Sequence, residues 1–289
     1  MAHATVIDGS RYVSLRDVDP ADDGGLTERE ANARLEPLSA ELLELQELLY
    51  AAETHGVLVI LQGMDAAGKD VTIRNVFAAA TPEAIRVRHF KPMSDEEQKH
   101  DFLWRVHVAT PARGELVIFD RSYYEQLVLP EVEHETTPEQ TAERAEDVRA
   151  FESILRHSGV IVVKFFLHIG SAEQERRLVE RMERPDVAWK ISARDWKARE
   201  AWDDYMAAYE KTMNATASPD APWHLVPADH QWFHNLVVAD TLVARLRPCR
   251  EGWVAARDER GRKKAAEARE AAPERVTAWT KPGPRRHPR

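Results

Sequence analysis

Cysteine is almost absent from this sequence, since Cys249 is the only one among 289 residues. A single thiol cannot form a disulfide within the chain, so a disulfide framework is excluded and a reducing compartment is the natural expectation. No apolar run approaches the roughly 20 residues that a membrane-spanning helix needs. The first residues also lack the basic and then apolar pattern of a secretion signal. We therefore expect a cytoplasmic protein that is neither exported nor inserted into a membrane.

Net positive charge is also lacking, because 49 Asp and Glu outweigh 40 Lys and Arg and give a formal net charge of −9. Such a chain is not an expected nucleic-acid binder, and any polyanionic partner must be held by a local basic cluster. Hydrophobic residues make up 43% and charged residues 31%, which fits a globular protein with a sizeable core. Length alone allows one large α/β domain or two small ones.

Short apolar, β-branched runs alternate with helical stretches through the middle of the chain. The expected strands are 57–61, 86–90, 116–119, 160–167 and 223–226. The expected helices are 27–54, 70–80, 95–108, 139–157, a charged stretch over 171–213 that breaks near Pro185, and 229–246. This order predicts an α/β fold of three layers, in which helices cover both faces of a five-stranded parallel sheet.

The two ends of the chain differ from this central domain, which we place at 27–250. Residues 1–26 are polar and aperiodic, and are predicted to form a poorly ordered or surface-laid N-terminal arm. Residues 251–289 hold 11 basic and 6 acidic side chains. A tail of this composition typically forms a solvated helix or is disordered, and binding of a polyanion is the alternative role.

The strongest motif is a phosphate-binding loop with G-x-x-x-x-G-K spacing, read as Gly63-Met64-Asp65-Ala66-Ala67-Gly68-Lys69-Asp70. It follows an apolar strand and precedes a helix. The glycines allow backbone N–H groups to point at a phosphate, and the helix N-terminus adds partial positive charge. Lys69 supplies a cation, whereas Asp70 replaces the usual hydroxyl that binds Mg²⁺. The metal site must therefore rely on other carboxylates.

Two carboxylates are candidates for that role. Asp65, inside the loop, is predicted to orient or deprotonate an attacking phosphate oxygen or to bind the metal, with a turn-capping role as the alternative. Asp120 ends the apolar run 116–119 as in a Walker B motif, which places it beside the loop at the carboxyl edge of the sheet. Arg121 is predicted to neutralise charge on the transferred group, unless it forms a structural ion pair.

Further basic side chains are predicted to contact a polyanion, some of them from a lid at about 171–213 that closes over the phosphates. A solvated charged face is the alternative for the arginines of the lid, because glutamates lie between them. The residues concerned are Arg74, Lys91, Arg105, Arg177 and Arg181.

Aromatic side chains at helical spacing occur at Trp202, Tyr205 and Tyr209, and we expect them to pack in the core rather than to stack on a nucleobase. His230 and His234 are four residues apart, but no third metal ligand accompanies them, so ordinary packing or surface roles are expected.

Taken together, these motifs resemble those of the family-2 polyphosphate kinases, over roughly residues 30–247. The resemblance implies a thymidylate-kinase-like fold with a helical lid. It also implies phosphoryl transfer between inorganic polyphosphate and a nucleoside mono- or diphosphate, with Mg²⁺ or Mn²⁺. We further expect a homo-oligomer, either a dimer or a tetramer. The family's catalytic set falls here on Asp65, Lys69, Asp120 and Arg121, and Asp70 agrees with the family pattern. The blocks that carry the resemblance are GMDAAGKD (63–70), FKP (90–92), HDFLWR (100–105), IFDRSYYE (118–125), KFFLHI (164–169), WDDYMAAYE (202–210) and PWHLVPADHQWF (222–233).

The expected mechanism places the nucleotide phosphate in the loop at 63–70 and brings polyphosphate along a basic groove. Two other functions stay open at this point: an ATP-dependent nucleotide or nucleoside kinase of the same fold, and a non-catalytic module that binds nucleotide. The leucine-rich face of 27–54 is a candidate interface between copies.

Overall fold

The computed structural model describes residues 4–271, and within them the strands form one six-stranded sheet with the order β1-β6-β5-β2-β4-β3. The strands β2 to β6 run parallel, whereas β1 lies antiparallel to β6 at one edge. The bounds of the strands are β1 (Thr5–Ile7), β2 (Gly56–Gln62), β3 (Ile85–His89), β4 (Leu116–Asp120), β5 (Val160–His168) and β6 (Trp223–Pro227).

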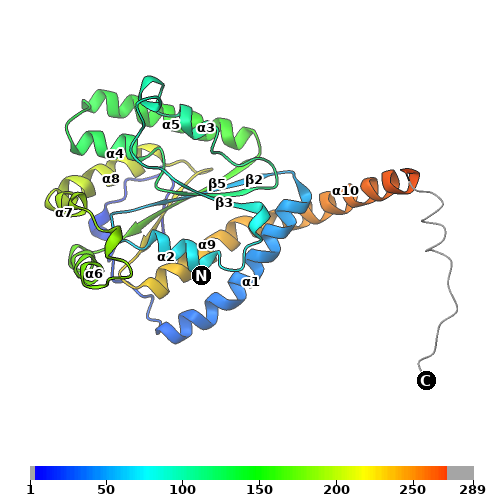
Figure 1. Cartoon of the computed structure of the whole chain (residues 1–289), viewed down its shortest axis with the longest axis horizontal. Coiled ribbons are helices and arrows are strands. Elements are labelled where there is room, and N and C mark those ends of the chain that lie inside the picture. The colour runs from blue at the N-terminus through cyan, green and yellow to red at the C-terminus, as the bar shows by residue number, and fades with distance from the viewer. Residues whose placement is uncertain (1–3, 272–289) are drawn as a thin grey trace.

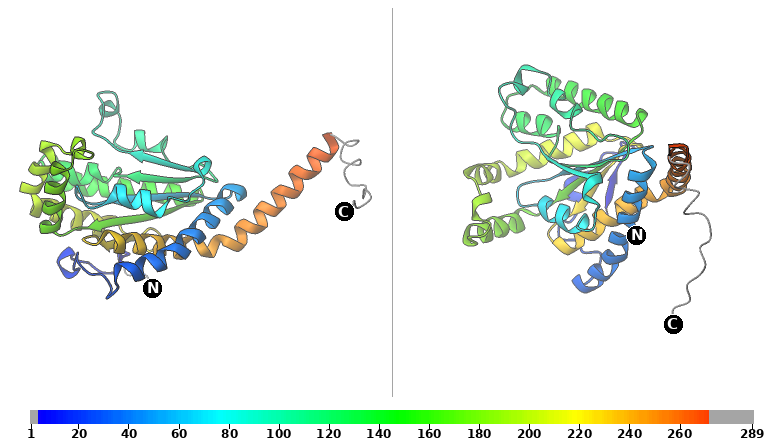
Figure 2. Two further views of the ribbon diagram at one scale, coloured as in Figure 1. Left: turned by 60° about the horizontal axis from the view of Figure 1, so that its bottom comes forward. Right: turned by 45° about the vertical axis from the view of Figure 1, so that its right-hand side comes forward.

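Helices cover both faces of this sheet, as expected for three layers (Figure 1). One layer contains α4, α5 and α8, and the other contains α1, α2 and α9. The helices α6 and α7 lie together at one end of the sheet, opposite to the end from which α10 projects (Figure 2). Their bounds are α1 (Glu28–Ala52), α2 (Lys69–Val76), α3 (Trp104–His107), α4 (Glu125–Val132), α5 (Pro138–His157), α6 (Ser171–Glu183), α7 (Ala193–Glu200), α8 (Trp202–Thr216), α9 (Gln231–Leu246) and α10 (Arg250–Ala271). Short 3₁₀ turns are η1 (Leu15–Asp17), η2 (Pro82–Ala84), η3 (Glu97–Lys99), η4 (Ala188–Lys190) and η5 (Arg247–Cys249).

The central strands are buried on both faces, which explains their unbroken apolar sequences. Every residue of β2 and of β4 is buried. In register, Leu61 of β2 pairs with Asp120 of β4, and Gln62 pairs with Phe166 of β5. Both β2 and β4 therefore end at the same edge of the sheet, and the loops that follow them meet there.

The first helix begins at a capping box in which the Thr27 side chain accepts from the N–H of Glu30, and Glu30 bonds back to Thr27. Its leucine-rich face packs against α9 and α10 of the same chain. This face is therefore used inside the fold, and it is not free to serve as the interface between copies that the sequence suggested.

The N-terminal arm contains a strand that the sequence did not predict, so the sheet has six strands rather than five and is not wholly parallel. The backbone N–H of Leu15 and the hydroxyl of Ser14 donate to Glu210 on α8, at 2.7 and 2.9 Å. Val13 and Leu15 are buried. A strand of three residues within a polar segment leaves too short a pattern to be recognised.

Two further segments differ from expectation. The predicted helix over 95–108 is reduced to the turn η3 and to α3, because Asp101 accepts from the N–H of Leu103 and starts a new turn. The helix α4, which follows the second carboxylate motif, was not predicted. It carries Glu125, a residue of the candidate site.

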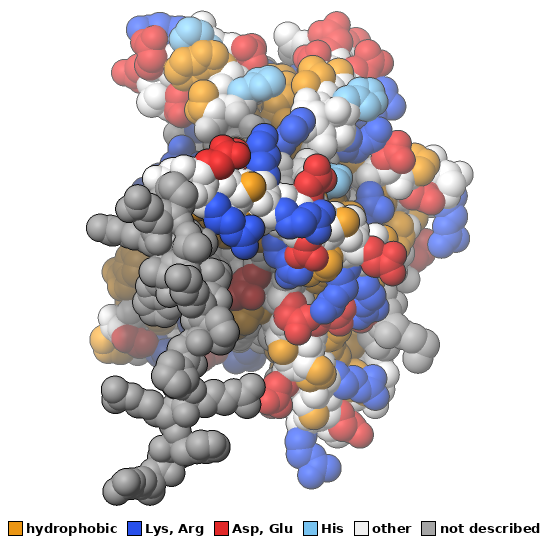
Figure 3. Space-filling view, turned by 90° about the vertical axis from the view of Figure 1, so that its right-hand side faces the viewer, with side chains coloured by type: hydrophobic (Ala, Val, Ile, Leu, Met, Phe, Trp, Pro, Cys, Tyr) orange, Lys and Arg blue, Asp and Glu red, His pale blue; other side chains and the backbone are white. Residues whose placement is uncertain are grey.

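The last helix extends well beyond the body of the protein, and Trp253 is its only buried residue within 250–271. The face from which it projects shows Lys and Arg side chains interspersed with Asp and Glu (Figure 3). The solvated helix expected for the tail is present as far as Ala271, and residues 272–289 lie outside the described part. None of the helices within residues 4–271 is long and apolar enough to cross a membrane.

Candidate active site

The loop between β2 and α2 needs its two glycines for steric reasons. Gly63 and Gly68 have φ angles of 146° and 111°, which side chains rarely tolerate. A Cβ atom on Gly63 would lie 2.7 Å from the carbonyl oxygen of Leu167, and one on Gly68 would lie 2.6 Å from the ring of His234. The loop is therefore fitted tightly against β5 and α9, and His234 has a packing role, as expected.

The ammonium group of Lys69 is buried inside this loop. Its Nζ donates to the carbonyl oxygens of Gly63 and Met64, at 2.7 and 3.1 Å. Burial, and to a smaller extent the nearby Arg121, lower the pKa of Lys69 below its ordinary value. The loop thus holds the Nζ atom of Lys69 at its centre, where a phosphate would be bound.

Asp65 and Arg121 form an ion pair that joins the loop to the turn after β4. Arg121 also contacts Glu125 of α4, with 3.0 Å between Nη1 and Oε2. Burial alone would raise the pKa of Asp65, but the charges of Arg121 and Lys69 outweigh it and lower the pKa below its ordinary value. Burial opposes the charge on Arg121, but Glu125 and Asp65 raise its pKa above the ordinary value. Both groups are therefore charged at neutral pH.

Asp120, at the end of β4, is also part of this cluster. Its side chain is 10% exposed, and its Oδ2 atom lies 2.9 Å from Nδ1 of His89, at the end of β3. The chain thus brings together Asp65, Lys69, Asp120 and Arg121, the four residues predicted as catalytic, at the carboxyl edge of the sheet.

Two cavities meet at the Asp65–Arg121 ion pair, since both residues line each of them. The first, here called the arginine cavity, has a volume of about 500 Å³ and is walled by the phosphate-binding loop and α6. Its lining includes Lys69, Asp70 and Asp120. Its basic residues besides Lys69 and Arg121 are Arg74, Arg177, Arg181 and Arg184.

The second, here called the tyrosine cavity, has a volume of about 250 Å³ and an amphipathic lining. Tyr205 and Tyr209 of α8 contribute aromatic surface, and Lys91 contributes a positive charge. The expectation that these tyrosines only pack in the core is therefore incomplete, although Tyr209 is buried. The other lining residues are Gly63, Met64, Phe90, Pro92, Glu125, Leu129, Ser192, Arg194, Asp195 and Ala198.

Arg177 uses all five of its N–H donors within the fold, although it lines the arginine cavity. Nε donates to Glu173 at 2.7 Å, Nη1 to the carbonyls of Ala66 and Ala67, and Nη2 to those of Ala228 and Asp229. Its side chain is only 7% exposed. In this structure Arg177 braces the phosphate-binding loop against α6 and the segment before α9.

Arg105 lines neither cavity. It donates to the carbonyl of Lys91 at 2.8 Å and lies over the ring of Phe90, so it holds the 90–97 segment in place. Among the other predicted polyanion contacts, Arg74 and Arg181 line the arginine cavity and Lys91 the tyrosine cavity.

Several residues of the site were missed from the sequence. Gln62 donates from Nε2 to Glu125 at 2.8 Å, and Gln174 of α6 donates to the carbonyl of Asp65 at 3.1 Å. His89 contacts Asp120, as described. Glu125 and His89 each lie within or beside a block that resembles the family, but only the sheet register brings them to the cluster.

The chain is similar in sequence to proteins of one family. A family model described as polyphosphate kinase 2 matches residues 25–251. An AMP/ADP-polyphosphate phosphotransferase of Meiothermus ruber is 42% identical over 235 residues, which cover 80% of this chain and 88% of that protein. An ADP-polyphosphate phosphotransferase of Rhodopseudomonas palustris is 40% identical over 217 residues, which cover 71% of this chain and 75% of that protein.

Solved structures agree with these matches. The crystal structure of polyphosphate kinase 2 from Arthrobacter aurescens TC1 has a TM-score of 0.79 and 35% sequence identity, and the match covers 86% of this chain and 92% of that chain. The resemblance drawn from the sequence motifs and the expected P-loop kinase-like fold are thereby confirmed. This chain belongs to the polyphosphate kinase 2 family.

Proposed function

We propose that this protein transfers the terminal phosphoryl group of inorganic polyphosphate to AMP or ADP. Its similarity to the Meiothermus and Rhodopseudomonas phosphotransferases supports these substrates. The observation that carries the proposal is the meeting of two chemically different cavities at Asp65 and Arg121, because a donor in one cavity and an acceptor in the other can then reach one reacting centre.

The linings of the cavities favour one assignment of substrates. The arginine cavity offers several positive charges and the phosphate-binding loop, which suits a chain of phosphates with no apolar part. The tyrosine cavity combines aromatic and apolar surface with Lys91 and Arg194, which suits a nucleobase and a phosphate. We therefore assign polyphosphate to the loop, which reverses the expectation that the nucleotide phosphate lies there.

Asp65 and Asp120 fit a divalent ion. Both line the arginine cavity and present the hard oxygen ligands that Mg²⁺ or Mn²⁺ prefers. Among the described residues, no group of three or more His, Cys, Asp and Glu side chains is arranged to hold a metal. Mg²⁺ is commonly held by one or two carboxylates together with substrate phosphates, so the pair is sufficient. The bound ion would offset charge on the phosphate oxygens.

The chain's own side chains supply positioning and charge. Lys69 and Arg121 would stabilise negative charge that spreads over the oxygens of the transferred group. Asp65 would orient the attacking phosphate oxygen from the boundary between the cavities. Arg181, on α6, would close over the phosphates together with the rest of the predicted lid at 171–213, which would exclude water from the reaction.

The direct test is incubation of the purified protein with polyphosphate, Mg²⁺ and either AMP or ADP, without ATP. New ADP or ATP is the expected result. Phosphorylation that occurs only with ATP as donor would instead indicate an ATP-dependent nucleotide kinase. Binding of nucleotide with no turnover would indicate a non-catalytic module.

The roles of the site residues are tested by two variants in the same assay. Asp65→Asn and Lys69→Ala should each lower kcat by about 100-fold or more, because each removes a preorganised charge at the reacting centre. Glu41→Gln is the matched control, since Glu41 pairs with Arg247 on the surface at 2.7 Å and should keep the wild-type rate. Near-normal rates in either site variant would contradict the assignment.

A further inference from the structure

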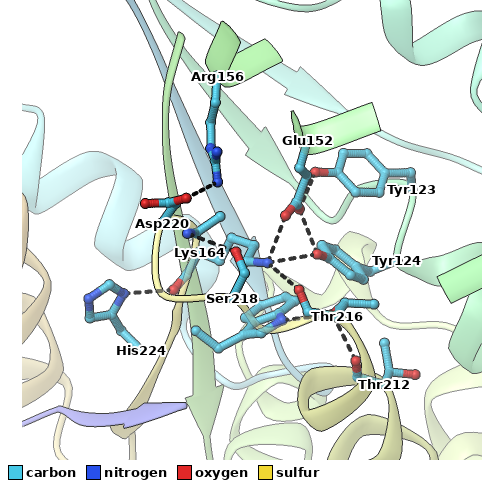
Figure 4. Close-up of polar contacts among 12 residues, drawn as sticks. Tyr123, Tyr124, Glu152, Arg156, Lys164, Thr212, Thr216, Ser218, Asp220 and His224 are labelled. Atoms are coloured by element: carbon cyan, nitrogen blue, oxygen red, sulfur yellow. Dashed lines mark hydrogen bonds and ion pairs between the residues drawn. The ribbon is translucent and has the colours of Figure 1, made fainter. Parts of the chain in front are cut away.

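A buried ion pair lies outside both cavities, between Glu152 of α5 and Lys164 of β5 (Figure 4). The Lys164 side chain is 0% exposed, and its Nζ lies 2.8 Å from Oε2 of Glu152. The same ammonium donates to the hydroxyl of Tyr124 at 3.1 Å and to the carbonyl of Thr216 at 3.0 Å. All three of its N–H donors are therefore used.

Two adjacent tyrosines complete this cluster. The hydroxyls of Tyr123 and Tyr124 donate to Oε1 of Glu152, at 2.7 and 2.6 Å. Burial raises the pKa of both tyrosines well above the ordinary value, so their hydroxyls stay protonated and keep donating. We call Tyr123, Tyr124, Glu152 and Lys164 the tyrosine–lysine cluster. None of the four lines either cavity, so none of them is placed to touch a substrate bound there.

Stability alone is a weak reason for such a cluster. Two buried charges lose their hydration, and well-packed apolar side chains of similar volume are often as stable or more so. A fully satisfied polar network does, however, fix one arrangement of the elements that carry it.

The tyrosines come directly after the turn that presents Arg121. Arg121 has a φ of 59°, a left-handed conformation that non-glycine residues adopt only where the surrounding structure enforces it. Directly after Arg121, Ser122 Oγ accepts from the N–H of Tyr124 and donates to Gln62 at the end of β2. The two residues that follow are the tyrosines, and Glu152 of α5 accepts from both of their hydroxyls. The strained residue is thus anchored from β2 and from α5.

The cluster also holds the end of α8. Lys164 bonds the carbonyl of Thr216, the last residue of that helix, and the Trp223 indole N–H donates to the hydroxyl of Thr216 at 3.1 Å. The same helix places Tyr205 and Tyr209 in the tyrosine cavity. One buried network therefore joins the Arg121 turn to the wall of the second cavity.

We propose that the tyrosine–lysine cluster is a positioning unit that holds Arg121 in its left-handed conformation, and so sets the angle at which the guanidinium meets the transferred phosphoryl group. The cluster acts on the rate of the chemical step rather than on substrate binding. This inference rests on the proposed phosphoryl transfer and on the role of Arg121 in it.

Tyr124→Phe tests the inference, because it removes the hydroxyl between Glu152 and Lys164 but keeps the ring. The expected result is a loss of about tenfold in kcat, with both KM values changed less than about twofold, since misplacement affects the transition state more than binding. Gln46→Met is the matched control. It breaks two partly buried hydrogen bonds to the backbone of Thr81, of 3.1 and 2.9 Å, and should lower the Tm without lowering kcat.

A double-mutant cycle with Arg121→Lys then separates positioning from general loss of structure. If the cluster acts through Arg121, Tyr124→Phe should change kcat less than about twofold in the Arg121→Lys background, because the group that it positions is already gone. An equal tenfold loss in both backgrounds would overturn the inference. An unchanged kcat with a lowered Tm would also overturn it, because it would show a purely structural role.

If Tyr124→Phe does not fold, Tyr123→Phe replaces it in the same cycle. This variant removes one hydrogen bond to Glu152 and leaves the ion pair intact, and it should show a smaller loss with the same non-additivity. The rate of the wild-type protein separates the proposed function from the positioning role of the cluster. A wild-type protein without transfer would contradict the proposed function, whereas normal transfer by both tyrosine variants would contradict only this inference.

Discussion

At the scale of the residue, the charge on Asp65 is maintained by its neighbours. The guanidinium of Arg121 and the ammonium of Lys69 keep the pKa of Asp65 below its ordinary value, against the opposing effect of burial. The carboxylate is thus ionised and aligned before any substrate arrives, which lowers the reorganisation needed during reaction.

This pKa shift predicts how stability depends on pH. Because the folded-state pKa is the lower one, ionised Asp65 stabilises the fold at pH values above the ordinary pKa of 3.8, and this stabilisation is lost as pH falls through the folded-state pKa. The free energy of unfolding of the wild type should exceed that of Asp65→Asn by a constant amount between about pH 5 and pH 7, and the difference should shrink below about pH 4. Urea unfolding of both proteins across this pH range measures the two free energies of unfolding. A difference between them that stays the same below about pH 4 would contradict the account.

The four central residues could be predicted from the sequence because each belongs to a local motif. The phosphate-binding loop places Asp65 and Lys69 after β2, and the apolar run of β4 ends in Asp120 and Arg121. Because β2 and β4 run parallel, their carboxyl ends lie at the same edge of the sheet, and the two motifs that follow them are expected to be neighbours. His89 and Glu125 depend on strand order and on the start of an unpredicted helix, which no local pattern specifies.

At the scale of the element, α6 combines two different uses of arginine within one turn. Arg177 points into the fold and binds four backbone carbonyls and Glu173, whereas Arg181 faces the arginine cavity. The sequence showed a row of arginines among glutamates. Helical spacing could not show which of them faced the loop and which faced the cavity, because that depends on the packing of α6 against the loop.

This difference predicts that one variant of α6 mainly loses stability and another mainly loses activity. Arg177→Ala should lower the free energy of unfolding by about 3–5 kcal/mol, because it leaves Glu173 and several buried carbonyls without their partner. Arg181→Ala should change it by less than about 0.5 kcal/mol while slowing phosphoryl transfer. Urea unfolding together with the polyphosphate assay separates the two roles. Equal losses of stability in the two variants would contradict the assignment of Arg177 as a brace.

Elements with long apolar or amphipathic patterns were predicted well, and short elements were not. The five parallel strands and the helices α1, α5 and α9 follow from hydrophobic periodicity. The strand β1 has only three residues, and its pairing with β6 depends on an edge left open by the rest of the sheet. The helix α3 is short because Asp101 interrupts the longer helical pattern by bonding locally.

At the scale of the whole molecule, the fold brings two cavities of different character to one ion pair. The arginine cavity lies between the phosphate-binding loop and α6, and the tyrosine cavity lies between the loop and α8. Composition gave no sign of this division, because the net charge of −9 hides a local concentration of arginine. The division depends on how the region 171–213 packs over the edge of the sheet.

The most direct test of this account is the measurement of both KM values in two single variants, Arg181→Ala and Tyr205→Ala. Arg181→Ala should raise the KM for polyphosphate by about tenfold and leave the KM for ADP within about twofold, because it removes a charge-assisted contact from one cavity only. Tyr205→Ala should raise the KM for ADP by about tenfold and leave the KM for polyphosphate within about twofold, since it removes aromatic surface from the tyrosine cavity. The account would be contradicted if Arg181→Ala raised mainly the KM for ADP and Tyr205→Ala mainly the KM for polyphosphate. It would also be contradicted if each variant changed both KM values equally, because polyphosphate and nucleotide would then not occupy separate cavities that meet at Asp65 and Arg121.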